Sequence, residues 1–385
     1  MTAVEDSPER LRRWRLLLGS ADDAPGAGML AGLDGSRDAT LEALYGEDAE
    51  RRGGLGRSSP RVARWLGDIR TYFPTSVVQV MQRDAMDRLG LRELLLEPEL
   101  LESVQPDIHL VGTLLALNHA IPERSRESAR AVVRQVVEEL ERRLAQKTRQ
   151  AVRGALHRAA RTRRPRLGDI DWNRTILANL RHYQPEHRTV IPEKLIGYGR
   201  HLPEVTREIV LCIDQSGSMA SSVVYAGVFG SVLASIRSIR TRVIAFDTAV
   251  VDLTEELHDP VDVLFGVQLG GGTDINVALQ YCETVIERPR DTILVLLSDL
   301  FDGGEWESTL ARARALVEGG VQMVALLALS DDGAPTFAHE NAAALADLGV
   351  PAFACTPDQF PDLMAAAIER RSLAEWAATN ELTAS

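Results

Sequence analysis

Ile209-Val210-Leu211-Cys212-Ile213-Asp214-Gln215-Ser216-Gly217-Ser218-Met219 is the stretch that decides the fold. Its first five residues form the continuous apolar run that is typical of a parallel strand covered on both faces. The run ends in a carboxylate, and hydroxyls follow two and four positions later. Open α/β sheets bind ligands just outside the carboxyl ends of such strands, so we expect the chemistry of this chain at Asp214.

The sequence from residue 205 onward alternates apolar runs with helical patterns. This alternation predicts an α/β fold with a doubly wound, mostly parallel, Rossmann-like sheet that is covered by helices on both faces. We expect strands at 208–214, 241–247, 292–298, 322–329 and 351–355, with an edge strand near 250–254. We expect helices at 220–239, 275–288, 305–319, 338–348 and 358–378.

The amino-terminal half has little strand character and many helix signals. Ser7-Pro8-Glu9 and Ser59-Pro60 each resemble a helix start with a capping residue and an early proline. Apolar residues at helical spacing predict one long helix from about 122 to 160, with a candidate break at Gly154. We therefore predict an all-helical domain over 1–168 and an α/β domain over 205–378.

The segment 169–204 between these domains carries Pro185, Pro192 and Pro203. Prolines at this spacing resist continuous helix, so we expect an extended strap laid over one of the domains. Trp172 and Tyr183 are expected to be its packing anchors.

Two further clusters of oxygen-bearing side chains follow Asp214. Thr273 comes directly after Gly270-Gly271-Gly272, and Asp299 follows the strand expected at 292–298. Glycines allow a backbone to approach an ion closely, and Asp299 lies at the same sheet edge as Asp214. Hydroxyls and carboxylates without Cys or His suit Mg²⁺ or Mn²⁺ better than Zn²⁺.

The set Asp214, Ser216, Ser218, Thr273 and Asp299 resembles the metal-ion-dependent adhesion site of von Willebrand factor A (VWA) domains. The resemblance implies that the two serines ligate the ion directly, while Thr273 and Asp299 alternate between direct and water-mediated contact. The surrounding sequence is similar to bacterial cytoplasmic VWA proteins of the CoxE-like type. That similarity implies a MoxR-type AAA+ ATPase as working partner.

The acidic residues of these clusters can also be explained as helix caps or turn residues. Asp214 alone could cap the next helix, but three oxygen clusters in the right order favour a shared metal site. Asp274 is interpreted mainly as the cap of the helix at 275–288, and Asp302 as a turn residue.

We interpret the chain as a binding adaptor, not an enzyme, in which the metal captures an acidic residue of a protein partner. The expected role is client remodelling or metallocofactor maturation. Neither a P-loop, a dinucleotide-binding motif nor a nucleophile elbow is present in the sequence. Two alternatives stay open: a metal-dependent phosphoester hydrolase, and a structural scaffold with a vestigial metal site.

Charge divides the chain of 385 residues, whose formal net charge is −12. Residues 205–385 carry 10 Arg against 26 Asp and Glu, a formal charge of −16, which leaves +4 for the rest. The stretch 142–166 is rich in Arg without a single acid. Three explanations of this basic stretch remain open: a solvated helix face, packing against the acidic half or an acidic partner, and nucleic-acid binding. No recognised nucleic-acid-binding fold accompanies the stretch, which argues against nucleic-acid binding.

The cysteines, the first residues and the distribution of apolar segments bear on the cellular compartment of the protein. Cys212, Cys282 and Cys355 lie in apolar elements without paired spacing, so we expect buried reduced thiols and no zinc site. The first ten residues lack a basic head followed by an apolar stretch, and no unbroken apolar segment reaches the length of a membrane span. We therefore expect a cytoplasmic protein.

Overall fold

The computed structural model describes residues 30, 32–46, 59–88, 101, 103–159, 161–162, 167–198, 207–267, 271–331 and 336–382. Contacts group the chain into two compact units, Met1–Val136 and Val137–Ser385. The division falls inside one long helix, α7 (Glu123–Ala159), which runs without interruption through Gly154. The expected break at Gly154 is therefore wrong, whereas the expected bounds of the helix are confirmed to within one residue at each end.

The described part of the amino-terminal unit is helical, as predicted, and Ser59-Pro60 opens a helix as expected. Trp65 is buried and its indole N–H donates to the carbonyl of Thr40 at 3.0 Å, which links two of the helices. The helix start expected at Ser7-Pro8-Glu9 lies outside the described residues. The helices of this unit before α7 are α2 (Gly32–Tyr45), α3 (Ser59–Tyr72), α4 (Thr75–Arg88), α6 (Ile108–Ala116) and the 3-10 turn η2 (Asn118–Ala120).

The segment between α7 and the sheet is more structured than the extended strap we expected. Asn179 explains why: its side chain donates to the carbonyls of Thr175 and Lys194 and accepts from the N–H groups of Glu193 and Lys194. These hydrogen bonds fold the part of the segment with Pro185 and Pro192 into a loop beside a short helix, whereas Pro203 lies outside the described residues. The elements are η3 (Leu167–Asp169), α8 (Trp172–Ala178), η4 (Leu180–His182), and the antiparallel pairs β1 (Arg161–Thr162) with β4 (Gly197–Tyr198) and β2 (Tyr183–Gln184) with β3 (Thr189–Val190).

The two aromatic residues of this segment are not packing anchors. Trp172 is 51% exposed and Tyr183 is 49% exposed. The buried Asn179 side chain instead links the two ends of the segment through its hydrogen bonds.

A six-stranded sheet forms the centre of the carboxyl-terminal unit, in the order β10-β9-β8-β5-β6-β7. All neighbouring strands are parallel except β7, which pairs antiparallel with β6 at the edge. The doubly wound sheet and its edge strand are thus confirmed. The strands are β5 (Arg207–Asp214), β6 (Ile239–Phe246), β7 (Val250–Asp252), β8 (Thr292–Leu297), β9 (Gln322–Leu329) and β10 (Ala352–Cys355).

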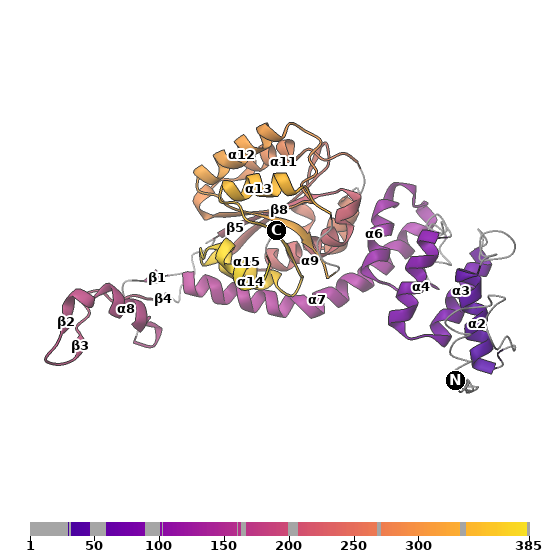
Figure 1. Cartoon of the computed structure of the whole chain (residues 1–385), viewed down its shortest axis with the longest axis horizontal. Helices are drawn as coiled ribbons and strands as arrows, with labels where there is room; N and C mark the ends of the chain where they lie inside the picture. The colour runs from indigo at the N-terminus through magenta and orange to yellow at the C-terminus, as the bar shows by residue number, and fades with distance from the viewer. Residues whose placement is uncertain are drawn as a thin grey trace, which may run out of the picture. The chain divides into compact units, whose positions relative to one another are not determined.

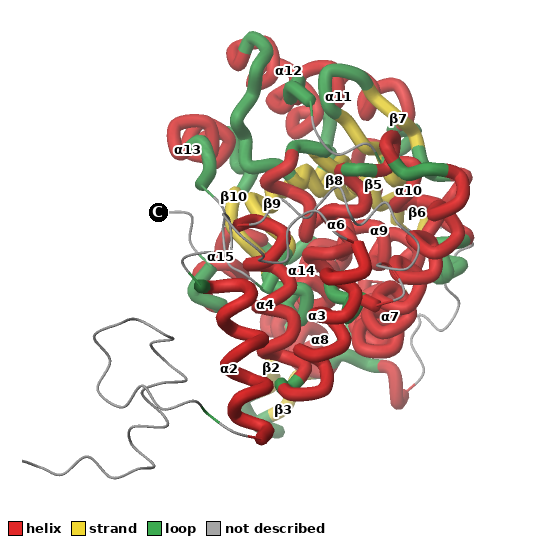
Figure 2. The backbone as a smooth tube through the Cα atoms, turned by 90° about the vertical axis from the view of Figure 1, so that its right-hand side faces the viewer, coloured by secondary structure: helices red, strands yellow, loops and turns green. Residues whose placement is uncertain are grey.

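Helices cover both faces of this sheet (Figures 1 and 2). α11, α12 and α13 pack on one face and share a core with side chains from β5, β6, β8 and β9. α9, α14 and α15 lie on the other face (Figure 1). The bounds are α9 (Ala220–Ala234), α10 (Pro260–Gly266), α11 (Ile275–Val285), α12 (Trp306–Glu318), α13 (His339–Asp347), α14 (Phe360–Ile368) and α15 (Leu373–Thr379), with 3-10 turns η5 (Gly217–Met219), η6 (Glu255–His258) and η7 (Pro289–Asp291).

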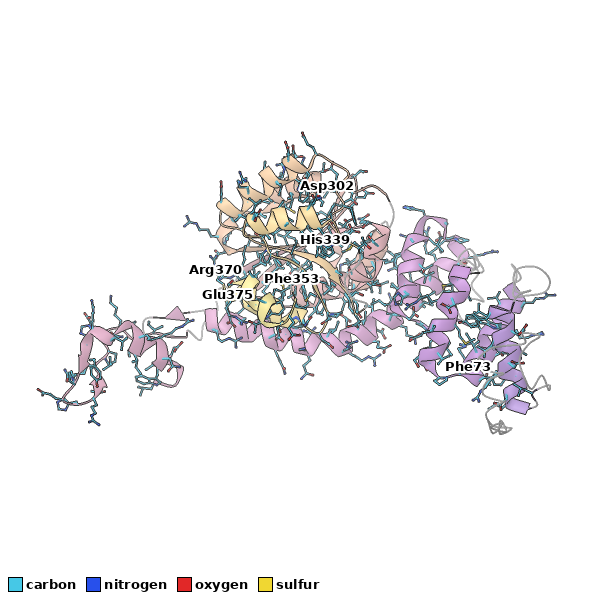
Figure 3. The ribbon with its side chains drawn as sticks, viewed as in Figure 1. Phe73, Asp302, His339, Phe353, Arg370 and Glu375 are labelled. Atoms are coloured by element: carbon cyan, nitrogen blue, oxygen red, sulfur yellow. The ribbon has the colours of Figure 1, made fainter. Side chains whose placement is uncertain are left out.

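The last helical stretch differs from the expected single helix at 358–378. Arg370, labelled in Figure 3, adopts φ +55°, a left-handed conformation that ends α14. The Ser372 hydroxyl then accepts from the N–H of Glu375 and caps α15. α10 was not expected at all.

The central helix α9 is apolar on all sides because it lies between the sheet and other helices. Gly217–Ala234 is, among the described residues, one helical stretch long and apolar enough to cross a membrane, and 72% of it is buried inside the molecule. A Cβ on Gly230 would come within 2.8 Å of a Val243 methyl, so the glycine allows α9 to approach β6. The apolar length of α9 is explained by its place in the core.

The cysteines behave as the sequence predicts. All three are free and buried. Burial raises the pKa of the Cys355 thiol to about 12, so this thiol stays protonated.

The carboxyl-terminal part of α7 forms ion pairs with the acidic body of the same unit. Arg143 meets Asp358 at 3.0 Å, Arg158 meets Glu369 at 2.6 Å, and the Lys147 ammonium donates to the Asp358 carbonyl. Of the three explanations for the basic stretch, packing against the acidic half therefore describes these three residues. Arg163, Arg164 and Arg166 lie outside the described residues.

Candidate metal site

The candidate site lies where the order of the strands reverses. The chain passes from β5 to β6 on one side, whereas β8 pairs with β5 on the other, so the carboxyl ends of β5 and β8 form the switch point at which open α/β sheets bind ligands. Asp214 is the last residue of β5, and Ser298 and Asp299 directly follow β8. The parallel register of these two strands brings the two loops together.

Asp214 is the buried centre of the site, with no exposed surface. Its Oδ1 accepts the backbone N–H of Ser216 at 2.9 Å and lies 3.4 Å from the Thr273 hydroxyl, while its Oδ2 accepts the Ser298 hydroxyl at 2.7 Å. Burial raises the pKa of the Asp214 carboxyl, and the hydrogen bonds from Ser298 and Ser216 oppose that shift. The fold thus holds a carboxylate at a place that disfavours its charge.

Ser216, Ser218 and Asp299 form the outer part of the site. The two serine hydroxyls are 3.2 Å apart, and the Ser218 hydroxyl donates to Asp299 Oδ2 at 2.5 Å. Asp299 is 5% exposed, Ser216 is half-buried and Ser218 is exposed. The cluster is therefore closed on the side of Asp214 and open to solvent on the side of the serines.

Thr273 reaches the site from the glycine-rich loop before α11. Gly271 has φ +145°, a conformation that L-residues rarely adopt, and a Cβ at this position would come within 3.2 Å of the Asp247 carboxylate. The carbonyl of Thr273 accepts the N–H of Gly303, and the N–H of Asp274 donates to the carbonyl of Asp247, both at 2.8 Å. The loop is thus fixed to its neighbours on both sides. Gly270 is outside the described residues.

Hydrogen bonds therefore connect all five sequence-predicted ligands, and the oxygen–oxygen distances described among them suit one small cation. In an octahedral site with metal–oxygen distances of about 2.1 Å, neighbouring ligand oxygens lie roughly 3 Å apart. The distances of 2.5, 3.2 and 3.4 Å between the site's oxygens bracket that value. Nowhere in the described chain do three or more His, Cys, Asp or Glu gather as a metal cluster, so the donor set here is two carboxylates and three hydroxyls. Such a set fits Mg²⁺ or Mn²⁺.

Ser298 has a role that sequence reasoning missed. It is fully buried, its hydroxyl donates to Asp214 and accepts the N–H of Leu300 at 3.0 Å, and so it orients the central carboxylate. The signal was present in the sequence as a hydroxyl at the end of an otherwise apolar strand. Its target, 84 residues away, could be identified only from the pairing of β5 with β8.

The two neighbouring acids have the structural roles that were predicted. Asp274 caps α11 by accepting the N–H of Val277. Asp302, labelled in Figure 3, is a turn residue whose carboxylate also accepts the N–H of Ile275 and the Thr309 hydroxyl. It therefore connects the loop after β8 with two helices.

Comparison with known proteins agrees with this arrangement. A family model described as "VWA domain containing CoxE-like protein" matches residues 144–364, which is more than half of the chain. The chain belongs to the CoxE-like VWA family. "Uncharacterized protein YehP" of Escherichia coli (strain K12) is 36% identical over 365 residues, covering 92% of this chain and 96% of the relative. The sheet with its covering helices is accordingly the VWA domain.

Solved structures with similar folds are distant. BatB from Bacteroides thetaiotaomicron is 16% identical, covers 44% of this chain and 99% of its own, and has a TM-score of 0.34. The Deinococcus radiodurans Ro (RSR) protein is 14% identical, covers 94% of this chain and 74% of its own, and has a TM-score of 0.31. At these values neither structure says anything about what the present chain does.

Proposed function

We propose that this protein is a metal-dependent binding adaptor. Asp214, Ser216, Ser218, Thr273 and Asp299 would hold Mg²⁺ or Mn²⁺, and the metal would capture an acidic residue of a protein partner. The bound cation would supply an electrophilic coordination position on the solvent-exposed side of the site.

One observation carries this proposal: two buried carboxylates meet without a protein cation. Asp214 is 0% and Asp299 is 5% exposed, yet none of the ion pairs among the described residues includes either of them. Hydroxyls and backbone N–H groups are the partners of both. Burying two negative charges side by side is costly, and a divalent cation would remove that cost.

The chain's own residues favour recognition over hydrolysis. Neither an imidazole nor an amine takes part in the hydrogen bonds described for the five residues, so among these contacts no His or Lys is placed to act as a general base. The serines contribute no charge, which leaves a bound ion electron-poor and receptive to an outside carboxylate.

The working partner we propose is a MoxR-type AAA+ ATPase, in keeping with membership of the CoxE-like family. The adaptor would act in the cytoplasm and recruit a client for remodelling or metallocofactor maturation. ATP hydrolysis would then belong to the ATPase.

Partner capture by the full chain tests this proposal. Immobilised wild-type protein with Mg²⁺ should retain the ATPase or a client, and Asp214→Ala or EDTA should abolish retention. Asp347→Ala, which removes an exposed acid from the end of α13, serves as the matched control and should behave as wild type. Retention by Asp214→Ala, or by wild type in EDTA, that equals retention by wild type with Mg²⁺ would contradict the proposal, and turnover of generic phosphodiesters by the purified protein would favour a hydrolase.

A further inference from the structure

A large apolar side chain is exposed beside the metal site. Phe301 follows the ligand Asp299 by two residues and is 50% exposed. Among the described residues of 207–382, Val251 is the other large hydrophobic residue with comparable exposure, at 39%. Apolar groups exposed next to a recognition site are typical of contact points for a partner.

The backbone fixes Phe301 in this exposed position. Leu300 adopts φ +63°, which is rare for a non-glycine residue, and its side chain is completely buried in the core under α11 and α12. The Leu300 carbonyl accepts the Asn341 side-chain amide at 2.9 Å. With Asp299 directed to the site and Leu300 to the core, the chain turns Phe301 outward.

A second set of hydrogen bonds makes this loop rigid. The N–H of Phe301 lies 3.3 Å from Asp299 Oδ1, so the aromatic residue and the metal ligand share one turn. Gly303 and Gly304 follow, and the Gly303 N–H is bonded to the loop that carries Thr273. Strained residues that are held in this way concentrate at functional sites. A rigid aromatic side chain loses little conformational entropy on binding, which suits an anchor.

The surroundings of Phe301 are acidic. The sequence has no Lys or Arg from Val243 to Glu287 or from Ile293 to Ala311, which includes the loops around the site. Asp302 follows Phe301 directly, and Glu305 comes three residues after Asp302. A carboxylate ligand approaching this face meets a negative rim, so its own flanking residues must supply positive charge or apolar contact.

We propose that Phe301 is the apolar half of the ligand site and that it selects the residue next to the captured acid. The ligand is a peptide segment in which Glu or Asp adjoins a large apolar residue such as Leu, Met or Phe, with Lys or Arg nearby. The acidic side chain would bind the metal, and its apolar neighbour would pack on the Phe301 ring. This inference rests on the proposed function and names the chemistry of its ligand.

Synthetic peptides bound to the full chain test this inference. The probes are 12-residue Gly/Ser peptides with one Glu and one Arg, in which the residue next to Glu is Ser, Leu, Met or Phe. In Mg²⁺, wild-type protein should bind the apolar variants at least about 5-fold more tightly than the Ser variant, as expected for burying one side chain at a contact point. Phe301→Ser should reduce that preference to less than about 2-fold.

Matched variants separate this inference from the proposed function. Val251→Ser removes the other exposed apolar residue and should keep the preference, and Phe301→Ser should bind Mn²⁺ as wild type does. Asp299→Ala should lose all Mg²⁺-dependent peptide binding. Mg²⁺-dependent binding of Glu peptides with no preference for an apolar neighbour overturns the inference alone. Absence of peptide binding by wild type, or binding by Asp299→Ala or in EDTA that equals the binding of wild type in Mg²⁺, overturns both.

Discussion

The carboxyl edge of the sheet and the basic face of α7 both gather charge, but they hold it in opposite ways. At the sheet edge, Asp214 and Asp299 are buried and contact hydroxyls and N–H groups. Along α7, Arg143 and Asp358 are about half exposed, at 47% and 55%, and each charge has an opposite charge as partner. In the proposed function a cation would complete the first arrangement, whereas the second is already neutralised and screened by solvent. Function is therefore expected at the edge and modest stabilisation along the helix.

The largest effect should come from the residue that orients the buried carboxylate. Ser298→Ala removes the hydroxyl that donates to Asp214 Oδ2, and loss of such an orienting partner typically weakens metal binding by about 10- to 100-fold. Isothermal titration with Mn²⁺ would measure this. Ser308→Ala, which removes a hydroxyl bonded to Glu305, should leave the affinity unchanged. Equal Mn²⁺ affinities for Ser298→Ala and wild type would contradict the view that the sheet edge, unlike the α7 face, is built to bind a cation.

The next effect concerns the turn that supports the site. Asp302→Ala removes the acceptor for Ile275 N–H, Gly304 N–H and the Thr309 hydroxyl. By analogy with lost helix caps, the free energy of unfolding should fall by about 1–2 kcal/mol, measured by urea denaturation. Thr309→Val, which removes one of the three donors, should lower the free energy of unfolding by less than Asp302→Ala does. A wild-type unfolding curve for Asp302→Ala would show that the turn does not depend on this carboxylate.

A smaller effect, of opposite sign, should come from removing charge at the centre of the site. Because burial raises the pKa of Asp214, the fold disfavours the ionised carboxyl at neutral pH, and Asp214→Asn relieves that penalty without changing the shape. Without metal, the variant should melt roughly 2–4 °C higher than wild type, equivalent to about 1 kcal/mol for a domain of this size.

Adding Mg²⁺ sharpens this test. The melting temperature of wild type should rise, since a ligand that binds the folded state stabilises it, and that of Asp214→Asn should not. A variant that is less stable than wild type without metal would contradict the claim that Asp214 is held at an energetic cost.

The smallest effect is expected along α7. A double-mutant cycle on Arg143 and Asp358 should give a coupling energy of about 0.2–1 kcal/mol, which falls as NaCl increases, because both side chains are about half exposed. Arg126 and Glu123, an exposed i,i+3 pair on the same helix, offer a comparison within unit 1. A coupling above about 2 kcal/mol would mean that the α7 contact is a structural requirement and that the contrast between the regions is wrong.

The sequence predicted what depends on local pattern. The apolar run before Asp214 and the spacing of Ser216 and Ser218 lie within one segment, so the central strand and half of the site could be read directly. The bounds of β9 agreed completely, because both ends of its run are marked by polar or glycine residues.

What the sequence missed depends on contacts across the fold. Ser298 acts on Asp214 across two paired strands, and no local pattern indicates that hydrogen bond. The left-handed Arg370 that ends α14 is not a glycine and therefore gave no signal. Asn179 folded the proline segment through hydrogen bonds to residues 14 and 15 positions later, which proline spacing alone could not reveal.

Direct titration of the full chain with Mn²⁺ tests the central claim, namely that buried carboxylates and hydroxyls at the ends of β5 and β8 share one divalent cation. We predict one bound ion per chain in wild type and in the control Asp347→Ala, and none in Asp214→Ala or Asp299→Ala. Wild-type protein that binds no divalent ion, or an Asp214→Ala variant that binds it equally well, would contradict the account.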